Sequence, residues 1–165
     1  MTDLKQFIDT TRAQAEMANT FEWSKRRDTW ICSLDDLFKQ IISWLREAGL
    51  EKENLELGAK DLSEETLGRY TAPTLSVHVA AGLVIDFNPV ASVIIGGYGR
   101  VDVTARRGLQ KIMLIATDAD ERKKPRETPS YERQWTWCIF EPGNSRRPTA
   151  FDQAGLTDLL TKLAS

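Results

Sequence analysis

The segment from Thr20 to Ala48 constrains the fold most, because its apolar residues repeat with helical spacing and neither proline nor glycine interrupts it. Gly49 follows at once, and glycine is the residue type that most often ends a helix. We therefore predict one continuous helix over about Thr20 to Ala48. Its apolar positions form two adjacent rows, which are Trp30, Leu34, Leu37, Ile41 and Trp44, beside Ile31, Phe38, Ile42 and Leu45.

This apolar arc is wider than the seam of a coiled coil, so we expect the helix to touch both another helix and a sheet. Phe38 and Trp44 are predicted to be almost fully buried. Apolar and small residues also recur at helical spacing between Thr2 and Ala18. The stretch NTFE, residues 19–22, has the form of a capping box that starts a new helix. The sequence therefore predicts a helical hairpin over residues 1–49.

After about Leu50 the apolar periodicity changes from helical to alternating, which indicates strands. The runs TLSVHV and LVIDF are predicted to form a hairpin about AAG, and GRVDVTA, LQKIMLIAT and QWTWCIF continue the alternation. Short connections between successive strands favour an antiparallel meander. Residues 118–133 carry no apolar period and are predicted to form a solvated loop. In the tail, Thr149 is the expected cap of a C-terminal helix.

These elements predict a single α+β domain over residues 1–165. We expect a two-layer sandwich in which the helical hairpin (1–49) and the C-terminal helix (146–165) cover one face of a mostly antiparallel sheet (50–145). A length of 165 residues with 41% apolar and 28% charged positions suits one globular core.

The stretch SVIIGGYGRVDV, residues 92–103, raises the question of a phosphate-binding loop. It lacks both the Walker pattern and the GxGxxG fingerprint, and a strand pattern rather than a helix follows Gly99. We interpret its glycines as a strand bend. The glycines would allow a bulge, a tight bend or a positive φ, and at least one of Gly96, Gly97 and Gly99 is expected to adopt a backbone conformation that is unfavourable for residues with a Cβ. No cofactor is expected.

Composition and charge give the sequence no global preference for nucleic acid or anionic lipid, because 22 basic and 24 acidic residues leave a net charge of -2. The N-terminal segment has the character of neither a signal nor a transit peptide. Cys32 and Cys138 are interpreted as reduced core thiols, which favours a cytoplasmic location.

Several polar residues remain as candidates for chemistry. His78 lies on the polar side of a strand without the GxSxG elbow of a triad hydrolase, and one histidine with two separated cysteines does not supply a zinc tetrad. If the hairpin phases hold, Asp86 and Asp102 share the face of His78, which allows a carboxylate metal site. We favour a polar sheet face on which Arg100 pairs with a carboxylate.

The basic clusters suggest a second kind of partner. Binding to a phosphate backbone requires several unopposed cations on one surface, and Arg106 and Arg107 with Arg122, Lys123 and Lys124 are the candidates besides Arg100. Acidic residues neighbour the second group, so nucleic acid is the less favoured partner. Trp23 lies near the predicted helix start and is a candidate anchor for a protein partner.

The function expected from these observations is a non-catalytic cytoplasmic protein that interacts with or regulates another protein. It would bind through the polar sheet face or the 118–133 loop. A nucleic-acid-binding accessory protein is the alternative, and a metal-dependent hydrolase at Asp86 and Asp102 is the third hypothesis. The sequence alone identifies neither the partner nor the oligomeric state.

Overall fold

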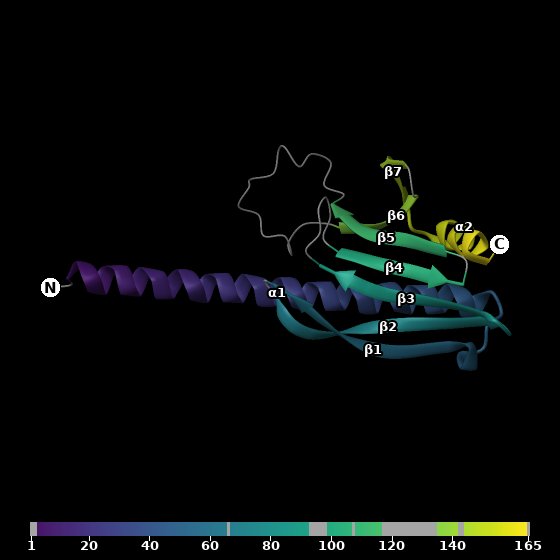
Figure 1. The fold of residues 1–165 in the computed structure, drawn as a ribbon, viewed down its shortest axis with the longest axis horizontal. Coiled ribbons are helices and arrows are strands. Elements are labelled where there is room, and N and C mark those ends of the chain that lie inside the picture. The colour runs from purple at the N-terminus through teal and green to yellow at the C-terminus, as the bar shows by residue number, and fades with distance from the viewer. Residues whose placement is uncertain are drawn as a thin grey trace.

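The computed structural model describes residues 3–65, 67–92, 99–106, 108–116, 135–141 and 144–164. One long helix precedes a sheet, and a short helix follows it (Figure 1). The elements in chain order are α1 (Leu4–Glu47), η1 (Lys52–Asn54), β1 (Leu55–Glu64), β2 (Gly68–Ala80), β3 (Leu83–Ala91), β4 (Gly99–Ala105), β5 (Gly108–Ala116), β6 (Trp135–Glu141), β7 (Asn144–Ala150) and α2 (Gln153–Ala164).

The predicted helical hairpin is wrong, because α1 is a single helix of 44 residues that passes through NTFE without a break. The true cap is Asp3, whose Oδ1 accepts a hydrogen bond of 2.7 Å from the Gln6 backbone N–H. With neither proline nor glycine from Leu4 to Glu47, nothing in the chain forces a turn, and a capping-box sequence is compatible with a helix interior. The predicted end is confirmed, since Gly49 has a φ of 112° just beyond the helix.

The sheet is a seven-stranded antiparallel meander in the order β1 to β7, as the alternating pattern predicted. The hairpin about AAG is confirmed, with Gly82 at a φ of 82° in its turn. Strand β1 was not predicted. It lies at an edge and most of its side chains are exposed, so its sequence carries little alternation. The predicted loop over 118–133 lies outside the described residues.

The C-terminal boundary differs from the prediction. Residues 144–150 form β7, in which Thr149 pairs with Ile139, so Thr149 does not cap a helix. Asp152 lies just before α2 and its Oδ1 accepts a hydrogen bond of 2.7 Å from the Gly155 backbone N–H. The helix pattern of the tail is correct only from Gln153 onward.

The core lies between the sheet and the two helices, and α1 contacts both β2 and α2. The expected contact of the long helix with another helix and a sheet is therefore confirmed, with α2 as the other helix. Phe38 is 1% exposed and packs edge-on against Phe87, with ring centroids 6.4 Å apart. Trp44 is only partly buried, at the rim beside Phe151. Cys32 is exposed, which contradicts its assignment to the core.

Gly99 is required by close packing rather than by its backbone angles. It is not among the described glycines with positive φ, which are Gly49, Gly68 and Gly82, so the strand-bend prediction fails there. Gly96 and Gly97 lie outside the described residues. A Cβ on Gly99 would lie 2.0 Å from a ring carbon of Trp30, which is fully buried. The missing side chain therefore lets the indole ring lie against β4.

We predict that Phe38→Ala destabilises the protein by about 3–5 kcal/mol, through lost transfer free energy and a residual cavity. Chemical denaturation monitored by circular dichroism measures this loss. A loss below about 1 kcal/mol would contradict the burial of Phe38 between α1 and β3.

We also predict that Gly99→Ala lowers stability by about 1–3 kcal/mol or more, since either Trp30 or the β4 backbone must move. Gly108→Ala is the matched control. Its Cβ would lie at an ordinary 3.6 Å from a methyl carbon of Leu163, so its effect should stay below about 1 kcal/mol. Equal losses in the two variants, measured by urea denaturation, would show that Trp30 does not create the requirement at Gly99.

Candidate functional site

The sheet face turned away from α1 and α2, here called the outer face, carries most of the described candidate residues. Asp86 pairs with Thr104 across β3 and β4, and Asn88 pairs with Asp102, so the two aspartates are diagonal neighbours. Alternate residues of these strands, such as Phe87 and Val103, are fully buried in the core. The antiparallel register therefore brings Asp86 and Asp102 to one polar surface, as the sequence pattern indicated.

Both carboxylates on the outer face already accept hydrogen bonds from neighbouring side chains. Asp86 Oδ1 accepts from the Ser76 hydroxyl at 2.6 Å. Arg100 donates to Asp102 through Nε at 2.7 Å and through Nη2 at 3.0 Å, which confirms the predicted pairing of Arg100 with a carboxylate. Within the described part of the chain, no group of three His, Cys, Asp or Glu side chains is arranged to hold a metal ion.

His78 lies two residues beyond Ser76 on β2 and is partly exposed. Its Nε2 lies 3.6 Å from Oε2 of Glu56, an exposed carboxylate on the edge strand β1. Such an exposed pair contributes little to stability and is a common surface contact. The structure thus places His78 at the margin of the outer face, beside a carboxylate of the neighbouring strand.

The predicted basic cluster is described only in part. Arg100 is engaged with Asp102, and Arg106 is exposed in the turn after β4. Arg107, Arg122, Lys123 and Lys124 lie outside the described residues. Trp23 is partly buried on α1, and the guanidinium of Arg26 lies 5.6 Å from its ring centroid. The candidate anchor Trp23 is therefore held against its own domain along part of its surface.

A polar cluster that the sequence did not reveal lies where β1 ends, β2 begins and β3 ends. The carboxylate of Glu64 accepts hydrogen bonds from the Tyr70 hydroxyl and from the backbone N–H and hydroxyl of Ser92. Tyr70 Oη accepts from Trp30 Nε1 at 3.2 Å, and Arg26 Nη2 donates to the Ser92 carbonyl at 3.1 Å. These residues are distant in sequence, so no local sequence motif indicates the cluster.

Burial is the main reason that the pKa of Tyr70 lies well above its usual range, and the hydrogen bond to Glu64 raises it further. Ser92 is fully buried, and its hydroxyl is satisfied by Glu64. Burial of a polar group costs free energy unless the group is hydrogen-bonded, and the groups of this cluster are bonded to one another. The cluster therefore fixes α1 on the sheet, and it presents no reactive group.

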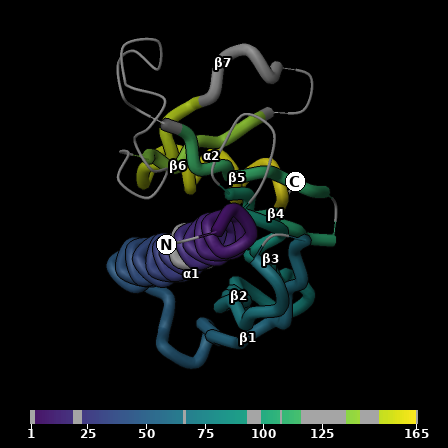
Figure 2. The backbone as a smooth tube through the Cα atoms, turned by 90° about the vertical axis from the view of Figure 1, so that its left-hand side faces the viewer, coloured from purple at the N-terminus to yellow at the C-terminus, as the bar shows by residue number. Residues whose placement is uncertain are grey.

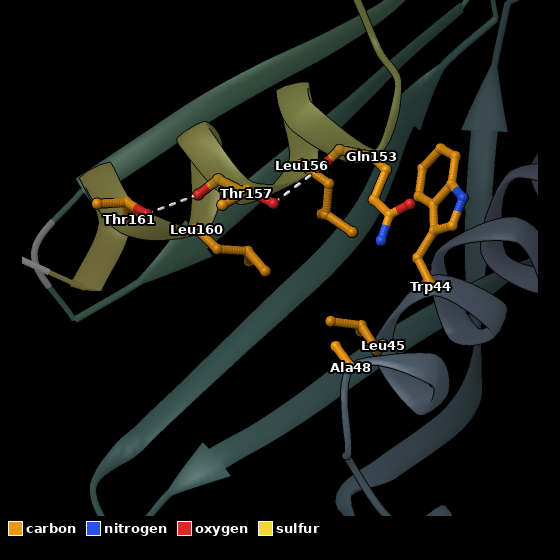
Figure 3. A pocket seen from close by; sticks show the side chains of 8 residues that line it. All are labelled: Trp44, Leu45, Ala48, Gln153, Leu156, Thr157, Leu160 and Thr161. Atoms are coloured by element: carbon orange, nitrogen blue, oxygen red, sulfur yellow. Dashed lines mark hydrogen bonds between the residues drawn. The ribbon is translucent and has the colours of Figure 1, made fainter.

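A small groove lies between the C-terminal end of α1 and the helix α2 (Figure 3). Its cavity has a volume of about 220 Å³. Two hydroxyls at its rim, those of Thr157 and Thr161, donate within α2 to the carbonyls of Gln153 and Thr157 at 2.9 and 2.7 Å. The groove is lined by Trp44, Leu45, Ala48, Gln153, Leu156, Thr157, Leu160 and Thr161.

The first third of α1 is the most unusual surface of the molecule. We call residues 4–18 the arm. It extends beyond the sheet as a straight continuation of α1 (Figure 1), and Figure 2 views it from its free end. Every side chain of the arm is exposed. Among its large apolar residues, Leu4 is 73%, Phe7 61% and Met17 73% exposed. The sequence pattern identified this helix but not its exposure.

We predict that a thiol reagent modifies Cys32 faster than Cys138, because Cys32 is exposed whereas burial raises the pKa of the Cys138 thiol. Cys138 lies in β6 opposite Met113, so its modification reports on access to the outer face. The extent of thiol labelling is measured over time by mass spectrometry of the intact protein. It should show a fast phase and a slow phase. Cys32→Ser should remove the fast phase and Cys138→Ser the slow phase, and a single rate for both thiols would contradict the described burial.

No family model matches this chain, and no curated protein or solved structure matches it.

Proposed function

We propose that this chain is a non-catalytic protein-interaction domain that presents the arm to a helical surface of a partner. The observation that supports this proposal is the exposure of Leu4, Phe7 and Met17 on a helix that extends beyond its own domain. Leu4, Phe7 and Ile8 lie within one turn of each other and form an exposed apolar patch. Such a patch is characteristic of a binding site. Every side chain of the arm is exposed, so tertiary packing contributes little to its helix, and a partner that covers its apolar side would stabilise it.

The outer face of the sheet is a second candidate surface for the same function. Its polar residues are partly buried and held by neighbours, as in the pairs Ser76 with Asp86 and Arg100 with Asp102. A preorganised polar surface of this kind suits the rim of an interface rather than its apolar centre. The arm supplies the large apolar side chains that usually dominate binding energy, so we propose the arm as the primary site.

Two alternatives have less support in the described residues. Nucleic-acid binding would need unopposed cations, whereas Arg100 is paired with Asp102 at 2.7 Å. A metal-dependent hydrolase at Asp86 and Asp102 would need open carboxylates, whereas both accept hydrogen bonds from their neighbours.

We propose that the protein acts in the cytoplasm. Both cysteines of the chain are free thiols, as a reducing compartment keeps them. In the ranges that the structure describes, no helix combines the length and the apolar character that a membrane crossing requires.

Photocrosslinking tests the proposal. Phe7 is replaced by benzoyl-phenylalanine in the full chain, which is then irradiated in native cells, and covalent adducts are identified by mass spectrometry. We expect a defined polypeptide adduct, because Phe7 projects from the proposed binding side. The matched control places the same group at Ala13, which is also exposed but lies half a turn away from Leu4 around the helix. Absence of an adduct at Phe7, or equal adducts at both positions, would contradict the proposal.

A further inference from the structure

The edge strand β1 is long and regular. It pairs with β2 over ten successive residue pairs, from Leu55 with Val77 to Glu64 with Gly68, without a register shift. On its other side β1 has no neighbour in the order of the described strands, and it lies at the margin of the molecule in Figure 1. Since alternate residues of a strand direct their N–H and C=O groups to opposite sides, about half of these groups in β1 face away from β2.

The opposite edge of the sheet, β7, differs from β1 in its protection against pairing. Strand β7 contains Pro148, which has no backbone N–H, and its pairing with β6 shifts register between Ile139 and Glu141. Prolines and bulges are devices that keep an edge strand from pairing with another chain. The sequence of β1 contains no proline and its ladder contains no bulge, so the edge of β1 is open to a further strand.

The exposed side chains of β1, residues 56–61, are complementary to themselves in one antiparallel register. Residues directly opposite each other in an antiparallel pair share one face of the sheet. A second copy related by a twofold axis through Gly58 therefore places Glu56 of each copy opposite Lys60 of the other. Both ion pairs lie on the outer face, because Glu56 is the register partner of Ser76.

The same register covers an exposed leucine on the other face of β1. Leu57 is 61% exposed, although its register partner Leu75 is fully buried. With the axis at Gly58, Leu57 of each copy lies opposite Ala59 of the other, and the two Leu57 side chains are diagonal neighbours across the axis. Burial of this apolar surface favours association.

Neighbouring registers lack this complementarity. A shift of the axis by one residue moves Glu56 opposite Gly58 or opposite Leu62, so both ion pairs are lost. A shift of the axis to Lys60 places Lys60 opposite itself and Glu56 opposite Glu64, and like charges directly opposite each other are destabilising. The order of charges along β1 therefore selects the register about Gly58.

We propose that β1 is a homodimerisation edge, at which the β1 strands of two copies of this chain pair in antiparallel orientation about Gly58. The two seven-stranded sheets then form one continuous sheet. This inference goes beyond the proposed function, because it does not involve the arm. The twofold axis is perpendicular to the sheet, and α1 runs roughly along the strands in Figure 1, so the two arms point in opposite directions and both stay accessible.

Sedimentation of the purified full chain tests the inference. The interface is small, so we expect a weak dimer with a dissociation constant of about 10–100 μM. From about 1 μM to about 1 mM the wild-type protein should change from monomer to dimer. Hydrogen exchange at both ends of this range should show slower exchange of β1 amides at the high concentration, because the outward N–H groups become bonded. Exchange in the arm should not depend on concentration.

Charge reversal tests the register. Lys60→Glu and Glu56→Lys each place like charges opposite each other at two points of the dimer, so each should weaken dimerisation about tenfold. An equimolar mixture of the two variants should associate again, because opposite charges then face each other. The double variant, Glu56→Lys with Lys60→Glu, should also dimerise like the wild type. The matched controls Lys39→Glu and Glu47→Lys reverse exposed charges on α1, and they should leave dimerisation unchanged.

Several results would overturn the inference. They are a wild-type protein that stays monomeric over the whole range, single variants that dimerise as strongly as the wild type, and slower exchange confined to a segment other than β1. Recovery in the mixture and in the double variant separates a loss of pairing from a loss of folding, and its failure would also overturn the register. None of these results changes the photocrosslinking at Phe7, so the proposed function is tested separately.

Discussion

The contact between Trp30 and β4 fixes the relation of the long helix to the sheet, and the rest of the structure depends on it. The indole lies against the bare backbone of Gly99 and 5.9 Å from the ring of Trp137, and its N–H donates to Tyr70. Tyr70 is joined in turn to Glu64. Since a fully buried tryptophan admits little rotation, this contact sets which side of α1 faces the domain along its whole length.

A stiff helix transmits that orientation over many residues. From Trp23 onward the core-facing side of α1 is covered by the domain, whereas in the arm the same side carries Asp9 and Glu16. The arm extends beyond the sheet (Figure 1), and its apolar residues are thereby presented to solvent. A hairpin would have covered them by folding the chain back, and without a helix-breaking residue the chain has no local means to do so. The unpartnered side of the arm is thus a direct result of helix continuity.

The sequence predicted much of the fold and part of the candidate surface. Helical spacing identified the buried row that includes Phe38, and alternation placed Asp86 and Asp102 on one face, because both periodicities are local properties of the backbone. The sequence prediction was wrong at NTFE, because a cap sequence is also compatible with a helix interior. It was wrong at Thr149 as well, because the edge strand β7 shows little alternation of apolar and polar residues. The shared face of Asp86 and Asp102 was predicted correctly, whereas the arm was taken for one half of a hairpin.

The sequence by itself determined the buried part of α1 with its end at Gly49, and the strands β2 to β6, since these depend on neighbours within a few residues. Only the tertiary structure decided that Gly99 must lack a side chain, that Glu64 joins Tyr70 and Ser92, and that the arm lacks cover from its own domain. Each of these depends on residues far apart in the chain. The packing of the helix on the sheet determines how close these residues lie in space. Local periodicity in the sequence does not encode that packing.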